Sequence, residues 1–315
     1  MINNPLVSVI IPNYNHASFL DERIQSVLNQ TYHNFEVFIL DDNSTDNSLE
    51  IIYKYKDNPH ISQIVINEIN SGSPFKQWHK GFELAKGELI WIAESDDSCE
   101  NTFLEALVES FIEDPECVMA FCRSIMIDED GNKLRPAIKG HGDEKMKGID
   151  FIREYMSIGC ETQNASSVIF KKDVALKMPS LYMECKGAGD RMFFAQIAEY
   201  GNVAIYDKQL NHYRQHGDNT TNMNFVKGIN QREDKKIMDY LCSKGYADPI
   251  ITKQRCFYYI ENFIYLYPIE SWKLKKEIIC LWDGSLKEYR LWMFRRIVHG
   301  IKRRVLNLLK LNQRW

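Results

Sequence analysis

In the N-terminal third of the chain, short apolar runs alternate with amphipathic segments, and this alternation is the feature that most constrains the fold. The runs Leu6–Pro12 and Phe35–Leu40 are rich in β-branched or aromatic residues and end at Pro, Asn or Asp, which is typical of buried strands. Between them, Ser18–Gln30 carries apolar residues at near-helical spacing. The same pattern continues through a helix from Ser44 to Tyr55, a strand at Ile61–Ile66, a helix at Pro74–Lys86 and a strand at Glu88–Ala93. This alternation predicts an α/β fold with a mainly parallel, Rossmann-like sheet covered by helices on both faces.

The pattern is less regular after Asp97, although further elements are recognisable. We expect a helix at Thr102–Glu113, strands at Val118–Cys122 and Val168–Phe170, and a helix at Asp190–Tyr200. From about Phe225 the spacing predicts helices to the end of the chain, interrupted near Gly245, Pro249, Pro268 and Gly284. The sequence therefore predicts an α/β domain followed by a helical C-terminal extension.

Polar residues follow three of the predicted strands at the point where each ends. They are Asn13-Tyr14-Asn15, Asp41-Asp42-Asn43-Ser44 and Glu94-Ser95-Asp96-Asp97. In open α/β sheets the ligand binds beyond the carboxyl ends of the strands, so these loops are the candidate site. No G-x-G-x-x-G follows the first strand and no G-x-x-x-x-G-K-[ST] occurs, which argues against dinucleotide dehydrogenases and P-loop enzymes.

Carboxylates are crowded in the turn Glu94-Ser95-Asp96-Asp97, which follows a strongly apolar run. Carboxylates this close repel one another unless a cation or solvent compensates their charge. Mg²⁺ or Mn²⁺ suits such a site, because these ions take one or two carboxylates and complete their coordination with water and substrate phosphates. The alternative is a solvated turn that caps the helix beginning near Thr102.

The turn Asp41–Asp46 and the loop residue Tyr14 allow both a structural and a ligand-binding interpretation. Ser44 or Thr45 is typical of a helix cap, whereas Asp41, the first residue after its strand, is well placed to accept a hydrogen bond from a ligand. Tyr14 could stack on a nucleobase or be an amphipathic surface residue. Asp41 and Tyr14 are therefore candidates for nucleotide binding.

Three segments, VSVIIPNYN, FEVFILDDNSTDNS and AKGELIWIAESDD, occur in an order and spacing that resembles the family 2 inverting glycosyltransferases of the GT-A fold. The resemblance is dense over residues 5–97 and continues more thinly to about 221. It implies a GT-A glycosyltransferase domain at 1–222, with a nucleotide-sugar donor half at 1–98 and an acceptor half at 99–222. The helical region with a basic tail then occupies 223–315.

By this resemblance, Pro12, Tyr14 and Asp41 would hold the nucleotide base. Asp96 and Asp97 would form the D-x-D-type element that binds the metal and the diphosphate. The full set of expected donor-binding residues is Pro12, Tyr14, Asn15, Asp41, Lys76, Ser95 and Asp96. The chain departs from the family pattern at Glu94, where Asp is more frequent, and at Lys76-Gln77-Trp78-His79-Lys80-Gly81, where many relatives carry Ala-Arg-Asn. Lys76 or His79 could replace that donor contact, whereas Trp78 is equally consistent with the core.

Gly189-Asp190-Arg191 resembles the family's acidic motif that supplies the catalytic base. An acceptor hydroxyl must lose its proton as it attacks the anomeric carbon, and Asp190 is the candidate for this role. Asp190 could also be the N-cap of the following helix, and the two roles are compatible.

The segment Tyr213–Asn219 resembles the Y-R-x-H segment of many relatives. His216 or Arg214 could meet the diphosphate or the metal, which makes His216 an expected metal ligand beside Asp96 and Asp97. The alternative is a structural histidine. A weaker resemblance places Asn164, Ser166 and Arg191 toward the acceptor.

The C-terminal segment 286–315 holds nine Lys or Arg residues and one acid, Glu288, although the whole chain has a net charge of −4. Within it Leu291, Phe294, Val298, Ile301, Val305 and Leu308 recur at spacings of three and four, which predicts an amphipathic helix. Such a helix could lie on an anionic membrane surface, pack on the preceding helices, or contact a second copy in a homodimer. The acidic remainder and the lack of a known binding motif argue against nucleic acid as a partner.

We expect a metal-dependent enzyme that moves a sugar, with inversion, from a UDP-sugar or related donor to a hydroxyl of a glycan or lipid-linked acceptor. A sugar-nucleotide-binding protein without catalysis and a nucleotidyltransferase are the alternatives. Eight cysteines without a C-x-x-C pair, no apolar leader after Met1 and no long apolar window favour a reducing cytoplasm. The basic tail would allow peripheral attachment at the inner face of the plasma membrane.

Overall fold

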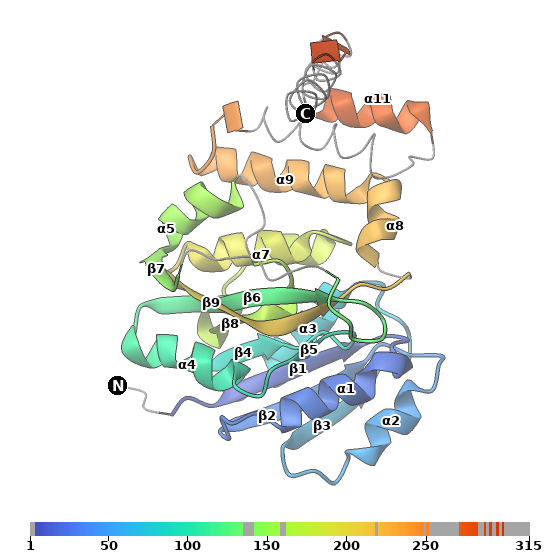
Figure 1. The fold of residues 1–315 in the computed structure, drawn as a ribbon, viewed down its shortest axis with the longest axis vertical. Helices are drawn as coiled ribbons and strands as arrows, with labels where there is room; N and C mark the ends of the chain where they lie inside the picture. Colours follow the sequence, from blue (N-terminus) through green and yellow to red (C-terminus); the bar gives the residue numbers. More distant parts are fainter. Residues whose placement is uncertain are drawn as a thin grey trace, which may run out of the picture. The chain divides into compact units, whose positions relative to one another are not determined.

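The computed structural model describes residues 4–134, 142–157, 162–217, 220–248, 250–251 and 271–282, and the positions 287, 290, 291, 294, 295 and 298. The chain forms two compact units, Met1–Thr220 and Thr221–Trp315. Figure 1 shows the helices and strands of both units.

The first unit is built on a nine-stranded sheet with the order β3-β2-β1-β4-β8-β6-β9-β5, and β7 pairs with β9. The strands are β1 Val7–Asn13, β2 Phe35–Asp41, β3 Ile61–Ile66, β4 Leu89–Ile92, β5 Ser98–Cys99, β6 Cys117–Ile127, β7 Glu144–Lys147, β8 Val168–Lys171 and β9 Asn202–Arg214. The first four neighbours in the sheet are parallel, β8 is antiparallel to β4 and β6, and β6 is parallel to β9. The predicted α/β class with a mainly parallel central sheet is confirmed.

Helices cover both faces of this sheet. They are α1 Ala17–Leu28, α2 Ser48–Lys54, α3 Pro74–Leu84, α4 Phe103–Glu113, α5 Gly148–Phe151, α6 Lys172–Ala175 and α7 Gly189–Ala198, with short helices η1 Ile152–Met156, η2 Ala165–Ser167 and η3 Ser180–Glu184. β1 and β2 are buried at every position, as expected of strands with both faces covered. The helix predicted at Asp190–Tyr200 is present as α7, within two residues at each end.

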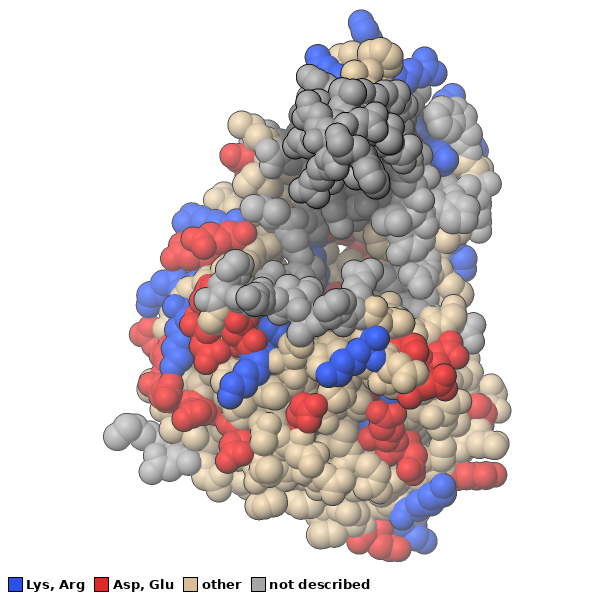
Figure 2. All heavy atoms as spheres, viewed as in Figure 1, with Lys and Arg blue, Asp and Glu red and all other residues tan. Residues whose placement is uncertain are grey.

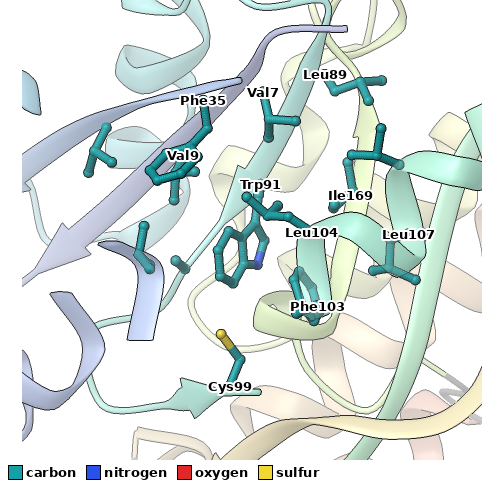
Figure 3. Packing of buried hydrophobic residues seen from close by; sticks show 14 of the residues in the cluster. Val7, Val9, Phe35, Leu89, Trp91, Cys99, Phe103, Leu104, Leu107 and Ile169 are labelled. Atoms are coloured by element: carbon teal, nitrogen blue, oxygen red, sulfur yellow. The ribbon is translucent and has the colours of Figure 1, made fainter. Parts of the chain in front are cut away.

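The two faces of the sheet pack differently. On one face, α1 and α4 cover a cluster that includes Val9, Trp91 and Phe103, and the rings of Trp91 and Phe103 stack with centroids 4.5 Å apart (Figure 3). On the other face, aromatic rings of α3 and α7 pack together, and Phe82 and Phe193 stack at 5.5 Å. This second cluster positions the N-terminus of α7 relative to α3.

Several elements differ from the sequence expectation. β6 extends well beyond the expected Val118–Cys122, and its partner β9 was not predicted because its central residues, Asp207, Lys208 and Gln209, are polar. α2 begins at Ser48 rather than near Ser44, because Ser44 N donates to Asp41 Oδ1 at 2.9 Å in a tight turn and Asn43 has φ of 64°. Side-chain hydrogen bonds to the backbone thus delay the helix by one turn.

The second unit contains α8 Thr220–Val226, α9 Ile229–Ser243 and α11 Trp272–Leu281. α9 and α11 contact each other: Trp282 Nε1 donates to Gln231 O at 3.1 Å, and Arg232 lies 3.2 Å from Glu277. Gly228 precedes α9 with φ of 69°, and an added Cβ would lie 2.7 Å from Ile278 Cδ1. The positive φ, which side chains with a Cβ rarely adopt, favours glycine at this turn.

No helix in the described part of the chain is both long and apolar enough to span a bilayer. Figure 2 shows frequent acidic side chains over the first unit and basic side chains on the second. At the tail positions that the structure describes, Lys287, Arg290, Leu291, Phe294, Arg295 and Val298, the side chains are exposed and the backbone is helical. The remaining tail residues lie outside the described ranges.

Candidate active site

The polar segments singled out in the sequence meet at one edge of the sheet. β1 pairs in parallel with both β2 and β4, so the carboxyl ends of these three strands lie side by side. Asn13 ends β1, Asp41 ends β2, and Glu94–Asp97 follows β4. Arg214 ends β9, and its backbone N donates to Asp97 Oδ1 at 2.9 Å.

Asp41 is buried, and three protein donors already bond its carboxylate. Asn13 Nδ2 donates to it at 2.7 Å, and Ser44 donates through both its backbone N at 2.9 Å and its hydroxyl at 2.6 Å. Asn15, with φ of 56°, joins the same loops, because its side-chain oxygen accepts a hydrogen bond from Thr45 N at 2.7 Å. Asp41 and Asn15 therefore fix the first two loops to each other.

Among the other residues expected to bind donor, Tyr14 and Lys76 have exposed side chains, whereas Pro12 is buried in β1. The Tyr14 side chain is 46% exposed and leaves the loop after β1. Lys76 Nζ donates to Ser71 O at 3.0 Å. Tyr14 is thus the aromatic group that this edge offers to a planar ligand.

Asp42 is a buried carboxylate that was not among the expected donor-binding residues. It accepts hydrogen bonds from Asn67 Nδ2 at 2.6 Å, Ser71 N at 2.9 Å and Gln77 Nε2 at 2.8 Å. These bonds join the end of β2 to the loop before α3 and to α3 itself. The position of Asp42 directly after Asp41 is the sequence signal that could have identified it.

Asp97 is buried, and the fold uses its carboxylate. Oδ2 accepts hydrogen bonds from Asn164 Nδ2 and Ser166 Oγ, both at 2.6 Å, while Oδ1 accepts the bond from Arg214 N. The buried guanidinium of Arg23 lies 3.9 Å from Oδ2. The structure therefore brings an expected metal ligand and two expected acceptor residues together, but it joins them to one another.

Asp96 lies beside two histidines. His216 Nε2 is 3.2 Å from Asp96 Oδ2, and His16 Nδ1 is 2.8 Å from the hydroxyl of Ser95. One ligand atom from each of His16, Asp96 and His216 lies within 4.8 Å of the other two. The sequence analysis predicted Asp96 and His216 but missed His16, whose position directly after the loop Asn13–Asn15 is the signal that could have found it.

The three carboxylates of the turn differ in pKa. Burial, and after it the nearby Asp96 charge, raises the pKa of Glu94 to about 8. Burial also raises the pKa of Asp97 to about 7, again with Asp96 as the second cause. Burial acts in the same direction on Asp96, but the hydrogen bond from His216 and the electrostatic effect of the two histidines outweigh it and lower the pKa. Asp96 is therefore the acid of this turn that ionises most readily.

Arg214 holds the backbone of the acidic turn. Its side chain is buried, Nε donates to Asp96 O at 2.8 Å, and Nη1 donates to Asp128 O at 3.0 Å and Glu129 O at 2.9 Å. Nη2 donates to Glu22 Oε2 at 2.5 Å. Arg214, which the sequence offered as a contact for the diphosphate, thus has protein partners on all three of its guanidinium nitrogens.

Trp78 links the acidic turn to α7. Its side chain is 1% exposed, so the core interpretation of this residue is correct, and its Nε1 donates to Glu94 Oε1 at 2.9 Å. Its ring also contacts Phe193 and Phe194 of α7, with centroids 6.0 and 6.4 Å away. One side chain therefore contacts both the acidic turn, through Glu94, and the helix of the base candidate.

Asp190 lies in the first turn of α7, where a carboxylate is favoured by the helix dipole. It is half-buried, and Oδ1 accepts a hydrogen bond from Arg191 N at 2.7 Å. Gly189 is required next to it, because an added Cβ would lie 2.6 Å from the ring of Phe75 and from Tyr182 O. Arg191 is buried and donates to Met156 O, so it anchors α7 from within.

The donor set fits a divalent cation. His16, Asp96 and His216 offer two imidazole nitrogens and one carboxylate oxygen, and they come from three loops at the ligand-binding edge of the sheet. Divalent ions that bind nucleotide phosphates use such partial protein coordination and keep positions for substrate oxygens and water. The arrangement can therefore hold a metal ion against the phosphates of a nucleotide.

Comparison with known sequences gives a family. The sequence model described as Glycosyl transferase family 2 matches residues 8–170, which is more than half of the chain. TuaG of Bacillus subtilis (strain 168), a glycosyltransferase named for teichuronic acid biosynthesis, is 32% identical over 158 residues. That match covers 50% of this chain and 61% of TuaG, so the chain matches less than two thirds of this relative.

Two solved structures share the fold. TarS residues 1–349 from S. aureus, in complex with UDP, has a TM-score of 0.56 and 19% identity, covering 90% of this chain and 89% of that one. The mannosyltransferase PcManGT from Pyrobaculum calidifontis, in complex with GDP-Man and Mn²⁺, has a TM-score of 0.56 and 16% identity, covering 93% and 80%. At these identities the likeness concerns the fold.

Proposed function

This chain belongs to glycosyl transferase family 2, and we propose that it moves a sugar, by single displacement with inversion, from a nucleotide-diphosphate donor to an acceptor hydroxyl. The observation that carries the proposal is the position of Asp96 beside His16 and His216, at the edge where the loop with Tyr14 also lies. A nucleotide diphosphate needs a place for its base and compensation for its charge, and this edge offers both.

A UDP-sugar is the proposed donor, in line with the UDP complex of TarS. Tyr14 would stack on the base, and the exposed Lys76 would approach from the first turn of α3. Asn13, Asn15 and Asp41 would shape this part of the site through the bonds they make with Ser44. Ser95 and Asp96 would face the diphosphate.

Asp96 and His216, with Mg²⁺ or Mn²⁺, form the proposed metal site, and the Mn²⁺ complex of PcManGT supports a divalent ion. When bound, the ion neutralises the charge that develops on the departing diphosphate. We assign Asp97 a positioning role rather than the ligand role expected from the sequence, because three hydrogen bonds from the protein occupy its carboxylate. Asn164 and Ser166 would act through Asp97 in the same way rather than on the acceptor.

Asp190 is the proposed base. Its half-buried carboxylate at the start of α7 would take the proton of the acceptor hydroxyl as oxygen attacks the anomeric carbon and the bond to the diphosphate breaks. Arg191, which donates to Met156 O, would hold the helix rather than contact the acceptor.

The acceptor is proposed to be a glycan or a lipid-linked sugar, reached by a cytoplasmic enzyme at the inner face of the plasma membrane. The exposed helical tail positions carry Lys287, Arg290 and Arg295 with Leu291 and Phe294, a combination that suits an anionic bilayer surface. A homodimer through the same segment is the alternative, and vesicle binding by the full chain separates the two.

The test is transfer itself. The protein is incubated with Mn²⁺, a panel of nucleotide sugars and simple glycans, and the product's anomeric configuration is read by proton NMR. A product of inverted configuration is expected. Retention would overturn single displacement, and donor binding without release of nucleotide would identify a non-catalytic sugar-nucleotide-binding protein instead. Formation of a sugar nucleotide and pyrophosphate from a nucleoside triphosphate would identify a nucleotidyltransferase.

A further inference from the structure

His16 is the residue of the candidate active site that no sequence motif assigns. It directly precedes α1, whereas Asp96 follows β4 and His216 follows β9, so three distant parts of the chain bring their ligand atoms within 4.8 Å of one another. The start of α1 does not require a histidine side chain at this position, because only the backbone O of His16 accepts the hydrogen bonds from Phe19 N and Leu20 N. The side chain is therefore available for another role.

The surroundings of His16 fix its ring. Nδ1 lies 2.8 Å from the hydroxyl of Ser95, the residue next to Asp96. When Nδ1–H donates to this hydroxyl, Nε2 keeps its lone pair, as in metal sites where the second ring nitrogen is held by an outer partner. The same turn thus orients both the histidine and the carboxylate.

His216 is held in a similar way by its neighbours. Its ring meets that of His16 edge to face, with centroids 5.6 Å apart and planes at 83°, and it packs on Phe19 at 5.3 Å. Aromatic packing alone would explain a pair of rings, but it would not explain why both rings bring a nitrogen to the oxygen of one carboxylate. A shared cation explains that convergence, because neutral imidazole is a frequent metal ligand.

The identity of the donors has a consequence for the metal. Mg²⁺ prefers oxygen ligands and holds its water strongly, whereas imidazole nitrogen suits transition metals. A site with one carboxylate and one histidine discriminates weakly between Mg²⁺ and Mn²⁺. A second histidine makes two of the three protein ligand atoms nitrogen, which favours Mn²⁺. Resting on the proposed function, we propose that His16 is a third protein ligand and that the set His16, Asp96 and His216 selects Mn²⁺ over Mg²⁺.

The experiment measures metal binding directly. Mn²⁺ is titrated into the full-length protein with UDP present, free Mn²⁺ is followed by electron paramagnetic resonance, and Mg²⁺ is used as competitor. The variants are His16→Ala and, as a matched control, His33→Ala, an exposed histidine away from the site. Thermal denaturation of each variant verifies that it is folded. If His16→Ala is not folded, His16→Gln is used in its place.

In the wild type, Mg²⁺ should displace Mn²⁺ only at large excess. Loss of an outer-shell partner costs roughly 10- to 100-fold in metal affinity, so loss of a direct ligand in His16→Ala should cost at least about tenfold and reduce the preference for Mn²⁺. Pulsed electron paramagnetic resonance should show coupling to two imidazole nitrogens in the wild type and in His33→Ala, but to one in His16→Ala.

Unchanged Mn²⁺ affinity and two coupled imidazoles in a folded His16→Ala or His16→Gln variant would overturn the inference and leave the proposed transfer intact. Failure of the proposed function looks different. In that case the wild type would bind Mn²⁺ with this nitrogen coupling but would release no nucleotide from any donor.

Discussion

The two halves of the sheet contribute differently to the candidate site. The parallel half, β3-β2-β1-β4, ends in loops that carry the exposed Tyr14 and the partly exposed Asp96 beside the buried carboxylates of Asp41, Asp42 and Asp97. The other half, β8-β6-β9-β5, supplies mainly buried partners: Ser166 and Arg214 hold Asp97, Arg214 also bonds the backbone O of Asp96, and His216 contacts the Asp96 side chain. The parallel half thus supplies the exposed groups of the candidate site, and the other half supplies partners that fix their positions, so we expect substitutions in the two halves to have different consequences.

The largest effect is expected at Asp190. This residue lies in α7, outside the parallel half of the sheet, yet it is proposed to act on the substrate, so it is an exception to the contrast between the two halves. Asp190→Asn removes the base and should lower kcat by roughly 10²–10⁴-fold, with UDP affinity retained. Turnover and calorimetric UDP binding are the measurements. The control is Asp173→Asn, which replaces an exposed acid in the first turn of α6. Near-normal turnover of Asp190→Asn would remove the base assignment.

Asp96→Asn should lower metal-dependent nucleotide release by roughly 10²–10³-fold, the scale of a lost electrostatic contact in an active site. Its melting temperature should change little, because the Asp96 side chain is 20% exposed and bonds His216 at the surface of the site. Release is measured with saturating Mn²⁺ and melting by circular dichroism. A variant that kept full activity would exclude Asp96 from the metal site.

Asp97→Asn should have the opposite profile. Its carboxylate accepts bonds from Asn164, Ser166 and Arg214, and an amide would turn an NH₂ group toward one of these donors. We expect about 1–3 kcal/mol of lost stability in urea unfolding, and a smaller loss of Mn²⁺ affinity than in Asp96→Asn. Unchanged stability combined with lost Mn²⁺ binding would restore Asp97 to the role of ligand.

Tyr14→Ala should weaken donor binding. Stacking on a base contributes about 1–3 kcal/mol, so the donor KM should rise roughly 5- to 150-fold while stability is unaffected. Tyr53→Ala is the matched control, because Tyr53 is 51% exposed on α2 and Tyr14 is 46% exposed. Equal KM values for the two variants would contradict the stacking role.

The smallest effect on catalysis is expected from the tail. Arg290→Glu combined with Arg295→Glu should reduce binding to anionic vesicles by about 30-fold or more, at about 1 kcal/mol for each basic residue. Turnover with a soluble acceptor should stay the same. Lys54→Glu with Lys56→Glu, at exposed positions of the first unit, is the control. A wild type that ignores anionic vesicles would exclude the membrane proposal.

The same contrast between halves describes what the sequence predicts. The parallel strands are apolar runs that are buried on both faces, so periodicity locates them. β9 was missed because Asp207, Lys208 and Gln209 interrupt any apolar pattern, and its pairing with β6, β5 and β7 makes it a strand. Local sequence does not contain that information.

For the candidate site, sequence identified which loops meet but not which side chains are free. Asp96 and Asp97 are adjacent acids with the same local pattern, and only tertiary contacts show that Asp97 is enclosed. His16 was missed for a related reason: a lone histidine after a loop has no signature until the fold brings it to Asp96. Which donors converge is therefore a tertiary property.

The central claim is a divalent-metal-dependent transfer from a nucleotide sugar, and nucleotide release under chelation tests it most directly. The full-length wild type is given a panel of UDP- and GDP-sugars with Mn²⁺, then with excess EDTA, and then with Mn²⁺ restored. We predict release from at least one donor that stops with EDTA and returns with Mn²⁺. Release that continues unchanged in EDTA, or no release from any donor, would contradict the claim.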